Sequence, residues 1–289
     1  MMRIKSFAKI NLGLEVVSRR EDNYHEIRTL FQTIDFYDVI QFLPTSSNKI
    51  VLKGDDKRVP WDKENLIFKA AALLKEKFRI PSGVEIRTVK KIPPGKGLGG
   101  GSSNAAMTLF SMNKIWELHL EREELMEMGK TLGADVPFFL EGGLCLGLGR
   151  GDQIIPLPDL DLIPCILALP SFSILTAHVY NQFRLSLTSE DKDSKIIKFL
   201  ADRKFDLLEN RLEETIFSLY PQLKVIWSLL RRQGSELSLV SGTGSAVFGL
   251  FRDRGKAKKC LVALKKRCPS LLVNTLSREQ YQRGINDGV

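Results

Sequence analysis

A glycine-rich stretch at residues 91–106, KIPPGKGLGGGSSNAA, has the composition of a loop that binds phosphate. Glycine allows positive φ angles and lets the backbone approach a ligand closely. Apolar residues at helical spacing follow, so unpaired N–H groups and the positive end of a helix dipole would meet at the stretch. A flexible turn with a serine cap is the simpler alternative, but it would not need so many glycines. We therefore expect the stretch to bind phosphate groups.

Two common phosphate-binding motifs do not fit this stretch. Residues 95–100, GKGLGG, match the pattern G-x-G-x-x-G, but a dinucleotide site would need a strand after the following helix. The apolar spacing predicts a second helix there instead. The Walker motif needs Ser or Thr after Gly-Lys, whereas Gly97 follows Lys96. Ser102 and Ser103 would add hydroxyl groups that can donate to phosphate oxygens or face a metal ion.

The composition is that of an ordinary globular protein. Of 289 residues, 43% are hydrophobic and 27% are charged. We find no apolar run of about 18 residues that would predict a membrane span, and no signal or transit peptide. The cysteines at 145, 165, 260 and 268 lack metal-ligand spacing, which favours buried or incidental thiols in a reducing cytosol. We expect a cytoplasmic protein, as a monomer or a homodimer.

The net charge of +9 comes from 43 basic and 34 acidic residues and suits an anionic partner. The densest basic cluster runs from Arg254 to Cys268. Ala257, Leu261 and Leu264 recur within it at spacings of 4 and 3, which predicts a packed helix with a solvated basic face. A basic nucleic-acid-binding module is an alternative of a different class. The basic residues form no stripe with interleaved aromatics, so we expect no nucleic-acid partner.

Regular elements flank the glycine-rich stretch in the first half of the chain. Alternation predicts a strand over Ile4–Val17, extended structure over residues 24–44 and a strand over Val84–Ile92. Helical spacing predicts helices over Asn65–Phe78, residues 104–116 and residues 121–132. The glycine-rich residues 133–152 read as partly extended. These elements would present the stretch at the start of a buried helix.

The second half begins where three prolines interrupt residues 154–164, and we divide the chain there into domains 1–157 and 158–289. A buried strand at residues 165–172 is followed by several helices, one with an apolar stripe of Leu223, Ile226, Trp227 and Leu230. Strands at residues 236–251 and 271–276 flank the basic helix. Mixed strands and helices predict an α+β protein in two parts.

Three segments in order along the chain resemble the motifs of the GHMP kinases. They are SFAKINLGLEV at residues 6–16, the glycine-rich stretch, and SLVSGTGSAVFGLF at residues 238–251. The resemblance implies the two-domain GHMP kinase fold, with a ribosomal protein S5 domain 2-like N-terminal domain and a ferredoxin-like α+β C-terminal domain. It also implies phosphoryl transfer from ATP to a small-molecule hydroxyl.

Two further segments, residues 20–38 and TLGADVPFFLEGG at residues 131–143, resemble one branch of this family. Its acceptor is a small molecule that carries a cytidine diphosphate group, in the non-mevalonate route to isoprenoid precursors. Asn23 departs from the glycine that is usual in this branch. A kinase of the mevalonate or homoserine type is the closest alternative, although those acceptors have no base to stack.

The resemblance implies that ATP is the cosubstrate and that Mg²⁺ accompanies it. It assigns ATP binding to the loop residues Pro93, Pro94, Gly95, Lys96, Gly97, Leu98, Gly99, Gly100, Gly101, Ser102 and Ser103. Lys96 stands where a small residue is usual, and it would either assist the phosphates or point to solvent. Asn65 and Leu66 fall at the adenine pocket, or else are an ordinary helix cap and a core leucine. No residue is identified as a metal ligand.

Asp135 matches the base of the family, which takes the proton of the acceptor hydroxyl. Its local alternative is an N-cap, because Val136-Pro137 follows it. Lys9 matches the lysine that pairs with this aspartate, where it would keep the carboxyl ionised and stabilise the forming alkoxide. Without the resemblance, Lys9 would read as an exposed strand lysine.

The resemblance also implies an acceptor site built from polar and aromatic groups. Tyr24 and Tyr180 would stack on the cytosine, and Asn11, His25 and Thr176 would contact the same end of the molecule. Gly242, Thr243 and Gly244 of the third motif would bring the C-terminal half against the site. We expect no membrane partner.

Overall fold

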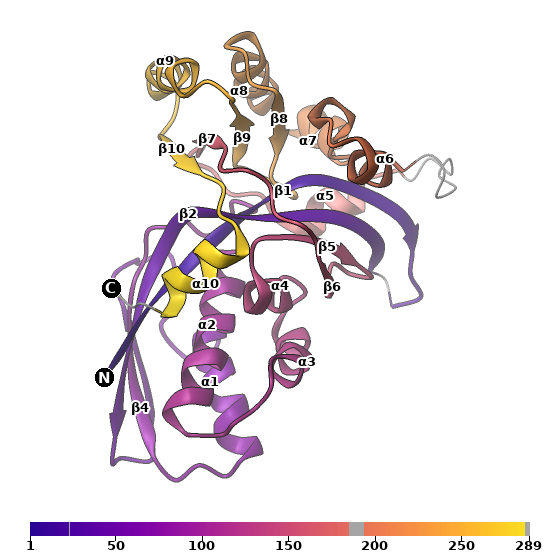
Figure 1. The fold of residues 1–289 in the computed structure, drawn as a ribbon. Coiled ribbons are helices and arrows are strands. Elements are labelled where there is room, and N and C mark those ends of the chain that lie inside the picture. Colours follow the sequence, from indigo (N-terminus) through magenta and orange to yellow (C-terminus); the bar gives the residue numbers. More distant parts are fainter. Residues whose placement is uncertain (23, 185–193, 287–289) are drawn as a thin grey trace.

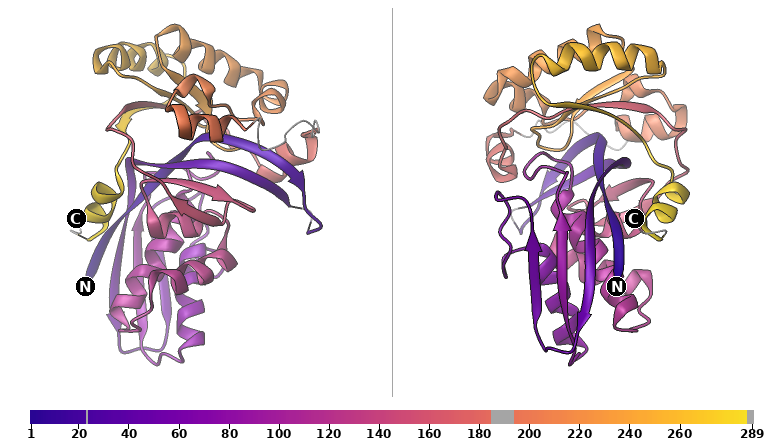
Figure 2. Two further views of the ribbon diagram at one scale, coloured as in Figure 1. Left: turned by 45° about the vertical axis from the view of Figure 1, so that its right-hand side comes forward. Right: turned by 90° about the vertical axis from the view of Figure 1, so that its left-hand side faces the viewer.

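The computed structural model describes residues 1–22, 24–184 and 194–286, and its strands form two sheets, one above the other in Figures 1 and 2. The first sheet has the order β3-β4-β2-β5-β6, with β1 also paired to β2, and the second has the order β10-β7-β9-β8. The strands are β1 (Met2–Arg19), β2 (His25–Thr45), β3 (Ile50–Gly54), β4 (Gly83–Val89), β5 (Leu144–Leu148), β6 (Gln153–Pro156), β7 (Pro164–Ala168), β8 (Leu237–Val240), β9 (Val247–Leu250) and β10 (Ser270–Asn274).

Helices cover the sheets of both halves (Figure 1). The first half contains α1 (Leu66–Lys77), α2 (Gly100–Ile115), α3 (Arg122–Leu132) and α4 (Val136–Glu141). The second contains α5 (Thr176–Gln182), α6 (Lys195–Asp202), a 3-10 turn (Phe205–Leu207), α7 (Glu213–Leu219), α8 (Pro221–Arg232) and α9 (Arg254–Lys265), and the last helix is α10 (Arg278–Asn286). None of the described helices is both long and apolar enough to cross a membrane.

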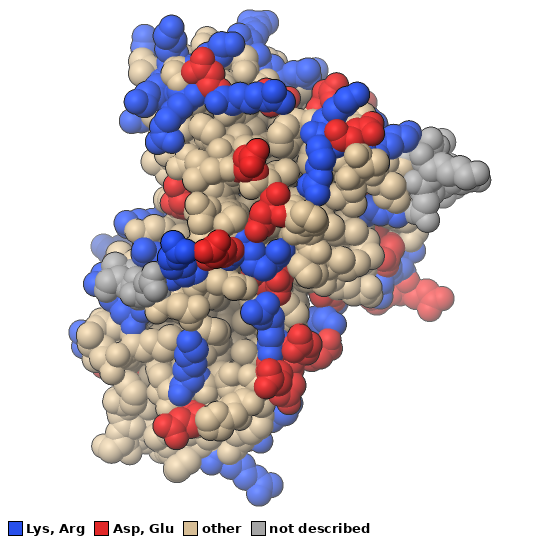
Figure 3. Space-filling model, in the orientation of Figure 1, with Lys and Arg blue, Asp and Glu red and all other residues tan. Residues whose placement is uncertain are grey.

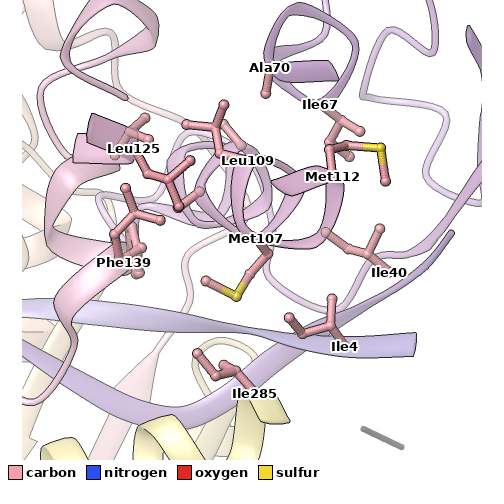
Figure 4. Packing of buried hydrophobic residues seen from close by; sticks show 14 of the residues in the cluster. Ile4, Ile40, Ile67, Ala70, Met107, Leu109, Met112, Leu125, Phe139 and Ile285 are labelled. Atoms are coloured by element: carbon pink, nitrogen blue, oxygen red, sulfur yellow. The ribbon is translucent and has the colours of Figure 1, made fainter. Parts of the chain in front are cut away.

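Helix α2 lies at the centre of the first core, between α1, α3, α4 and the strands β1 and β2. It is apolar on most sides, so it buries residues on faces that an amphipathic helix would leave in water. Figure 4 shows Ile4, Ile40, Ile67, Ala70, Met107, Leu109, Met112, Leu125, Phe139 and Ile285 packed around and along this helix. Because α2 is held on several sides, its N-terminus has a fixed position, and that terminus carries the glycine-rich stretch.

The second half confirms the expected ferredoxin-like α+β arrangement. Its four strands have the sheet order of a β-α-β-β-α-β unit, in which helices α5 to α8 together stand between β7 and β8 and α9 stands between β9 and β10. Each paired set of these strands is antiparallel. Leu223, Ile226 and Leu230 are buried along α8, as the sequence predicts. Helix α9 buries Ala257 and Leu264 and turns its lysines outward. Figure 3 shows basic side chains gathered over α9 at the top left, with acidic ones interspersed across the same face.

Two elements near the glycine-rich stretch differ from the sequence prediction. Helix α2 begins at Gly100 instead of near residue 104, because Gly99 takes a left-handed φ of 68° and serves as its N-cap. Strand β4 ends at Val89 instead of Ile92, because the N–H groups of Lys91 and Ile92 donate to the carboxylate of Asp38, not to a strand. The helix terminus therefore lies within the loop itself.

Helices α4 and α10 were not predicted. Helix α10 has few apolar residues, but it returns to the first half, where Tyr281 is buried and its hydroxyl donates to the carbonyl of Phe139. Arg278 pairs with Glu141 of α4 at 2.6 Å.

The chain passes from the first sheet to the second between Pro156 and Pro164, near the expected domain boundary. Residues after β10 then pack on the N-terminal half.

Candidate active site

Lys9 and Asp135 meet between β1 and the start of α4. The ammonium nitrogen of Lys9 lies 3.3 Å from a carboxylate oxygen of Asp135. Asp135 stands at the N-cap position of α4, but its side chain makes no capping hydrogen bond. Its side chain is 31% exposed, so the carboxylate has access both to Lys9 and to solvent. The pairing expected from the sequence is present, and the capping alternative holds for the backbone position alone.

Lys9 is held in a defined orientation and is not an exposed strand lysine. Its side chain is 4% exposed, and its ammonium lies 5.2 Å from the centre of the Phe31 ring. The ammonium also donates to the side-chain carbonyl of Asn11 at 2.5 Å. Residues two apart in a strand point to the same face, which brings Lys9 and Asn11 together on β1. The cation is thus fixed between a carboxylate and an amide.

Asn11 has partners within the protein at both ends of its side-chain amide, and its expected contact with the cytidine end of an acceptor stays a prediction. Its amide nitrogen donates to the hydroxyl of Thr29 at 2.8 Å, while its amide oxygen accepts from Lys9. Its backbone N–H donates to the hydroxyl of Ser241 at 3.3 Å. Because the side chain is buried and bonded at both ends, its effect on chemistry would pass through the position of Lys9.

The glycines of the loop allow other parts of the protein to approach its backbone closely. Gly97 has a φ of 73°, and a Cβ atom added there would lie 2.0 Å from the carbonyl oxygen of Ser241. At Gly99 the added atom would lie 2.7 Å from the ring of Phe139. The hydroxyl of Ser241 donates to the carbonyl of Gly97 at 2.8 Å. The third motif thus packs directly against the glycine loop.

A first cavity, which we call the loop cavity, has a volume of about 370 Å³ and follows the glycine loop to the start of α1. Asn65 caps α1 by accepting from the N–H of Ile67 at 2.9 Å, and it also lines this cavity next to Leu66. The helix-cap reading of Asn65 is therefore confirmed, and the adenine-pocket reading stays a prediction. The lining consists of Arg58, Val59, Pro60, Glu64, Asn65, Leu66, Lys90, Ile92, Pro93, Pro94, Gly95, Lys96, Gly97, Leu98, Gly99, Gly100, Gly101, Ser102 and Asn104.

The two serines of the loop have different surroundings. Ser102 lines the loop cavity, whereas Ser103 is fully buried and its hydroxyl accepts from the hydroxyl of Ser6 at 2.7 Å. The N–H of Ser103 donates to the carbonyl of Gly99 at 2.8 Å, within the first turn of α2. The expectation that the hydroxyl of Ser103 faces phosphate is therefore corrected, because its side chain turns into the core, and the same expectation for Ser102 stays a prediction.

Lys96 does not point to solvent, although a lysine in a loop usually does. Its side chain is 4% exposed, and its ammonium donates to the carbonyl of Pro170 at 2.7 Å and to that of Phe172. Burial lowers the pKa of Lys96 below its ordinary value, and the nearby charge of Arg58 lowers it further. The loop is thereby attached to the C-terminal half through a buried cation.

A second, larger cavity, which we call the central cavity, has a volume of about 980 Å³ and lies between the two halves. It shares Gly97 and Ser102 with the loop cavity, so the two cavities meet at the loop. Its lining consists of Lys9, Asn11, Leu14, Arg19, Asp22, Tyr24, His25, Ile27, Phe31, Gly97, Ser102, Ala134, Asp135, Arg150, Thr176, Ala177, Tyr180, Asn181, Phe183, Gly242 and Thr243. Every acceptor-site residue expected from the sequence is in this set. Gly244 of the third motif is not.

Aromatic rings occupy one end of the central cavity. The rings of His25 and Tyr180 stack with their centres 4.9 Å apart, and Tyr24 is 57% exposed. Burial lowers the pKa of His25, with a smaller effect from Arg19, so the neutral ring is favoured. Burial and the charge of Asp135 raise the pKa of Tyr180, so its hydroxyl stays protonated.

Further contacts at this end of the central cavity were not expected from the sequence. The guanidinium of Arg150 lies 5.1 Å from the centre of the Tyr24 ring, a cation–π contact between distant segments that no sequence motif signals. The hydroxyls of Thr176 and Thr243 are 3.1 Å apart, which joins α5 to the third motif. Asn23 lies outside the described residues.

Comparison with known proteins gives a consistent family. The family model described as GHMP kinases N terminal domain matches residues 65–143, and that described as GHMP kinases C terminal matches residues 196–270. A protein of Syntrophus aciditrophicus (strain SB) named 4-diphosphocytidyl-2-C-methyl-D-erythritol kinase is 40% identical over 267 residues, which are 92% of this chain and 95% of that protein. One of the same name from Bacillus velezensis is 37% identical and covers 96% of this chain and 99% of its own length.

Solved structures give the same result. The crystal structure of a 4-(cytidine 5'-diphospho)-2C-methyl-D-erythritol kinase is 34% identical, with a TM-score of 0.80 over 95% of this chain and 99% of that chain. A homoserine kinase from Cytophaga hutchinsonii has a TM-score of 0.74 over 96% of this chain and 95% of its own, at 21% identity, which is a likeness of fold alone. The two-part fold expected from the sequence is confirmed.

Proposed function

The chain belongs to the GHMP kinase family, and we propose that it transfers the γ-phosphoryl group of ATP to the 2-hydroxyl of 4-diphosphocytidyl-2-C-methyl-D-erythritol. One observation carries the proposal. The Lys9–Asp135 pair lies in the central cavity, and that cavity meets the loop cavity at Gly97 and Ser102. A phosphoryl group held at the loop would therefore lie next to a carboxylate that can take a proton.

ATP binding is supported by the geometry of the loop cavity. Phosphate groups favour the N-terminus of a helix, where backbone N–H groups and the helix dipole act together. Helix α2 begins inside the glycine loop, and the loop cavity continues from there to Asn65 and Leu66. We assign the triphosphate to the loop and the adenine to the end near α1.

The cytidine end of the acceptor is assigned to the aromatic end of the central cavity. Stacking of a base on an aromatic side chain contributes about 1–3 kcal/mol, and Tyr24, His25 and Tyr180 supply three rings there. Mevalonate and homoserine have no base to stack. These rings favour a cytidine-carrying acceptor over the mevalonate or homoserine type.

The proposed chemistry needs a base and a nearby positive charge. Asp135 takes the proton of the 2-hydroxyl as the oxygen forms its bond to the γ-phosphorus, and the bond to the β-phosphate oxygen breaks to release ADP. Lys9 lies beside this carboxylate and stabilises negative charge on the attacking oxygen. Asn11 keeps the ammonium of Lys9 in place.

Magnesium fits this arrangement as an ion held mainly by phosphate. Among the described residues no group of three His, Cys, Asp or Glu side chains could hold a metal, so a closed protein site is not offered there. Mg²⁺ usually needs only one or two protein ligands beside phosphates and water. The hydroxyl of Ser102, where the cavities meet, and the carboxylate of Asp135, in the central cavity, would offer oxygen ligands to such an ion. When bound, the ion would neutralise phosphate charge.

A coupled assay of ADP release tests the proposal. We expect ATP-dependent turnover with 4-diphosphocytidyl-2-C-methyl-D-erythritol and none with mevalonate or homoserine. Turnover of mevalonate without turnover of the cytidine compound would be compatible with the family assignment but would refute the proposed acceptor. We assign the reaction to the cytoplasm, where ATP is available and the four unpaired thiols would stay reduced.

A further inference from the structure

The charges around the loop cavity are balanced except at one position. Four charged side chains line the cavity: Arg58, Glu64, Lys90 and Lys96. Arg58 and Glu64 each form an ion pair, at 2.6 and 2.9 Å, and Lys90 pairs with the buried carboxylate of Asp38. Within residues 1–22, 24–184 and 194–286, no carboxylate lies in ion-pair distance of Lys96. Of the four charged side chains that line this cavity, Lys96 is the one for which the described part of the chain supplies no counter-charge.

The ammonium of Lys96 is hydrogen-bonded, yet its charge is not neutralised. It donates to the carbonyls of Pro170 and Phe172, which are dipoles and carry no net charge. An ammonium has three donors, so these two contacts do not exhaust it. Burying a charge without an ion partner is unfavourable unless something else compensates for it. An anion in the adjoining cavity would supply that compensation.

The position of this ammonium is fixed by several contacts. The carbonyl of Phe172 also accepts from the hydroxyl of Ser245 at 2.6 Å, and the carbonyl of Lys96 accepts from the N–H of Ala246 at 3.1 Å. The hydroxyl of Ser173 donates to the carbonyl of Pro94 at 3.3 Å. Two segments of the C-terminal half thus hold Lys96, and their contacts fix the position of its charge beside the cavity.

We propose that Lys96 is a specificity-determining residue whose unbalanced charge selects nucleotides by their number of phosphates. The proposal rests on the proposed function, since it takes ATP as the occupant of the loop cavity. A purely structural role is the alternative, in which Lys96 only ties the loop to residues 170–172. The two roles differ in one respect: a charge acts on phosphate, whereas a structural tie affects adenosine and ATP alike.

Calorimetric titration of ATP, ADP and adenosine separates these roles. The variants are Lys96→Met, which removes charge and donors, and Lys96→Gln, which keeps donors without charge. Lys91→Met is the matched control, because it removes the same charge from an exposed side chain of the same segment. We expect both Lys96 variants to bind ATP about tenfold more weakly, ADP less so, and adenosine within about twofold. The control should bind all three like the unaltered protein.

Each other outcome counts against the proposal. Unchanged ATP affinity in both Lys96 variants would overturn it, and so would an equal loss for adenosine and ATP. Thermal melting of Lys96→Gln monitors the fold, and failure of that variant to fold would assign Lys96 a structural role and also overturn the proposal. ADP release by the unaltered enzyme is a separate measurement that tests the acceptor. If no ADP is released with the cytidine compound, the acceptor assignment is refuted. A loss of affinity that grows with the number of phosphates would still support the proposed role of Lys96.

Discussion

The ammonium of Lys9 lies 3.3 Å from the carboxylate of Asp135, at the point where a long strand of the first sheet passes the start of a short helix. Three hydrogen bonds connect the pair to other parts of the molecule, and two of them join segments that are distant in sequence. Asn11 accepts from Lys9, Ser241 of the third motif bonds to Asn11, and the same serine bonds to Gly97 of the glycine loop. The Lys9–Asp135 pair, the loop and the C-terminal half therefore form one hydrogen-bonded unit.

Replacing Asn11 tests this unit. We expect Asn11→Ala to lower kcat about 10- to 100-fold, because a misplaced Lys9 no longer orients Asp135. The KM for the cytidine acceptor should stay within about threefold, since the amide of Asn11 is already bonded inside the protein. Steady-state kinetics with both substrates measures the two effects. A large rise in KM at unchanged kcat would show instead that Asn11 binds the acceptor.

Gly97 should not tolerate a side chain. We expect Gly97→Ala to lower the melting temperature, because the new methyl group would meet the carbonyl of Ser241 and the left-handed φ costs about 1–2 kcal/mol. Gly101→Ala is the control for stability, since its nearest neighbour would be a side-chain atom of Leu66 at 3.7 Å. Equal melting temperatures for the two variants would contradict the packing of the third motif on the loop.

Tyr24 should contribute to acceptor binding without contributing much to folding. Its ring is 57% exposed, so Tyr24→Ala leaves little cavity behind. We expect the KM for the cytidine acceptor to rise about tenfold from the loss of stacking, while the KM for ATP is unchanged. Tyr24→Phe keeps the ring and should behave like the unaltered enzyme. A rise in both KM values would point to a general effect on the site.

Glu213 should make stability depend on pH. Burial raises its pKa to about 8, against a hydrogen bond from the N–H of Val240 that lowers it. An acid whose pKa is raised on folding favours the folded state at low pH, and that contribution declines as pH rises from about 4.5 to about 8. Its slope is at most about 1.4 kcal/mol per pH unit. Glu213→Gln should flatten this decline in denaturant titrations across that range, and an unaltered slope would contradict it.

Much of the fold follows from local patterns in the sequence. The alternation around Lys9 predicts β1, although residues 6–16 of that strand are buried on both faces. The apolar spacing of residues 65–78 predicts α1, because that helix buries one periodic face. Helix α10 escapes prediction, since it offers little beyond Tyr281 and Ile285 as an apolar signal and is held by partners far away in the chain.

The parts of the site that belong to a sequence motif were predictable. The parts that depend on contacts between distant segments were not. The positions of Lys9, Asp135 and the glycine loop follow from residue order, and the structure brings them together. The surroundings of Ser103 and Lys96 do not follow from residue order. The burial of Ser103 depends on Ser6 of a distant strand. Lys96 likewise depends on carbonyl groups about 75 residues later, and carbonyls leave no mark in a sequence.

The central claim is that Asp135 takes a proton from the 2-hydroxyl of the cytidine acceptor. The most direct measurement is the turnover number of Asp135→Asn relative to the unaltered enzyme, by ADP release with 4-diphosphocytidyl-2-C-methyl-D-erythritol, together with its calorimetric affinity for ATP. We predict a loss of about 10²- to 10⁴-fold in turnover with ATP affinity within about threefold. Near-normal turnover in Asp135→Asn would contradict the account.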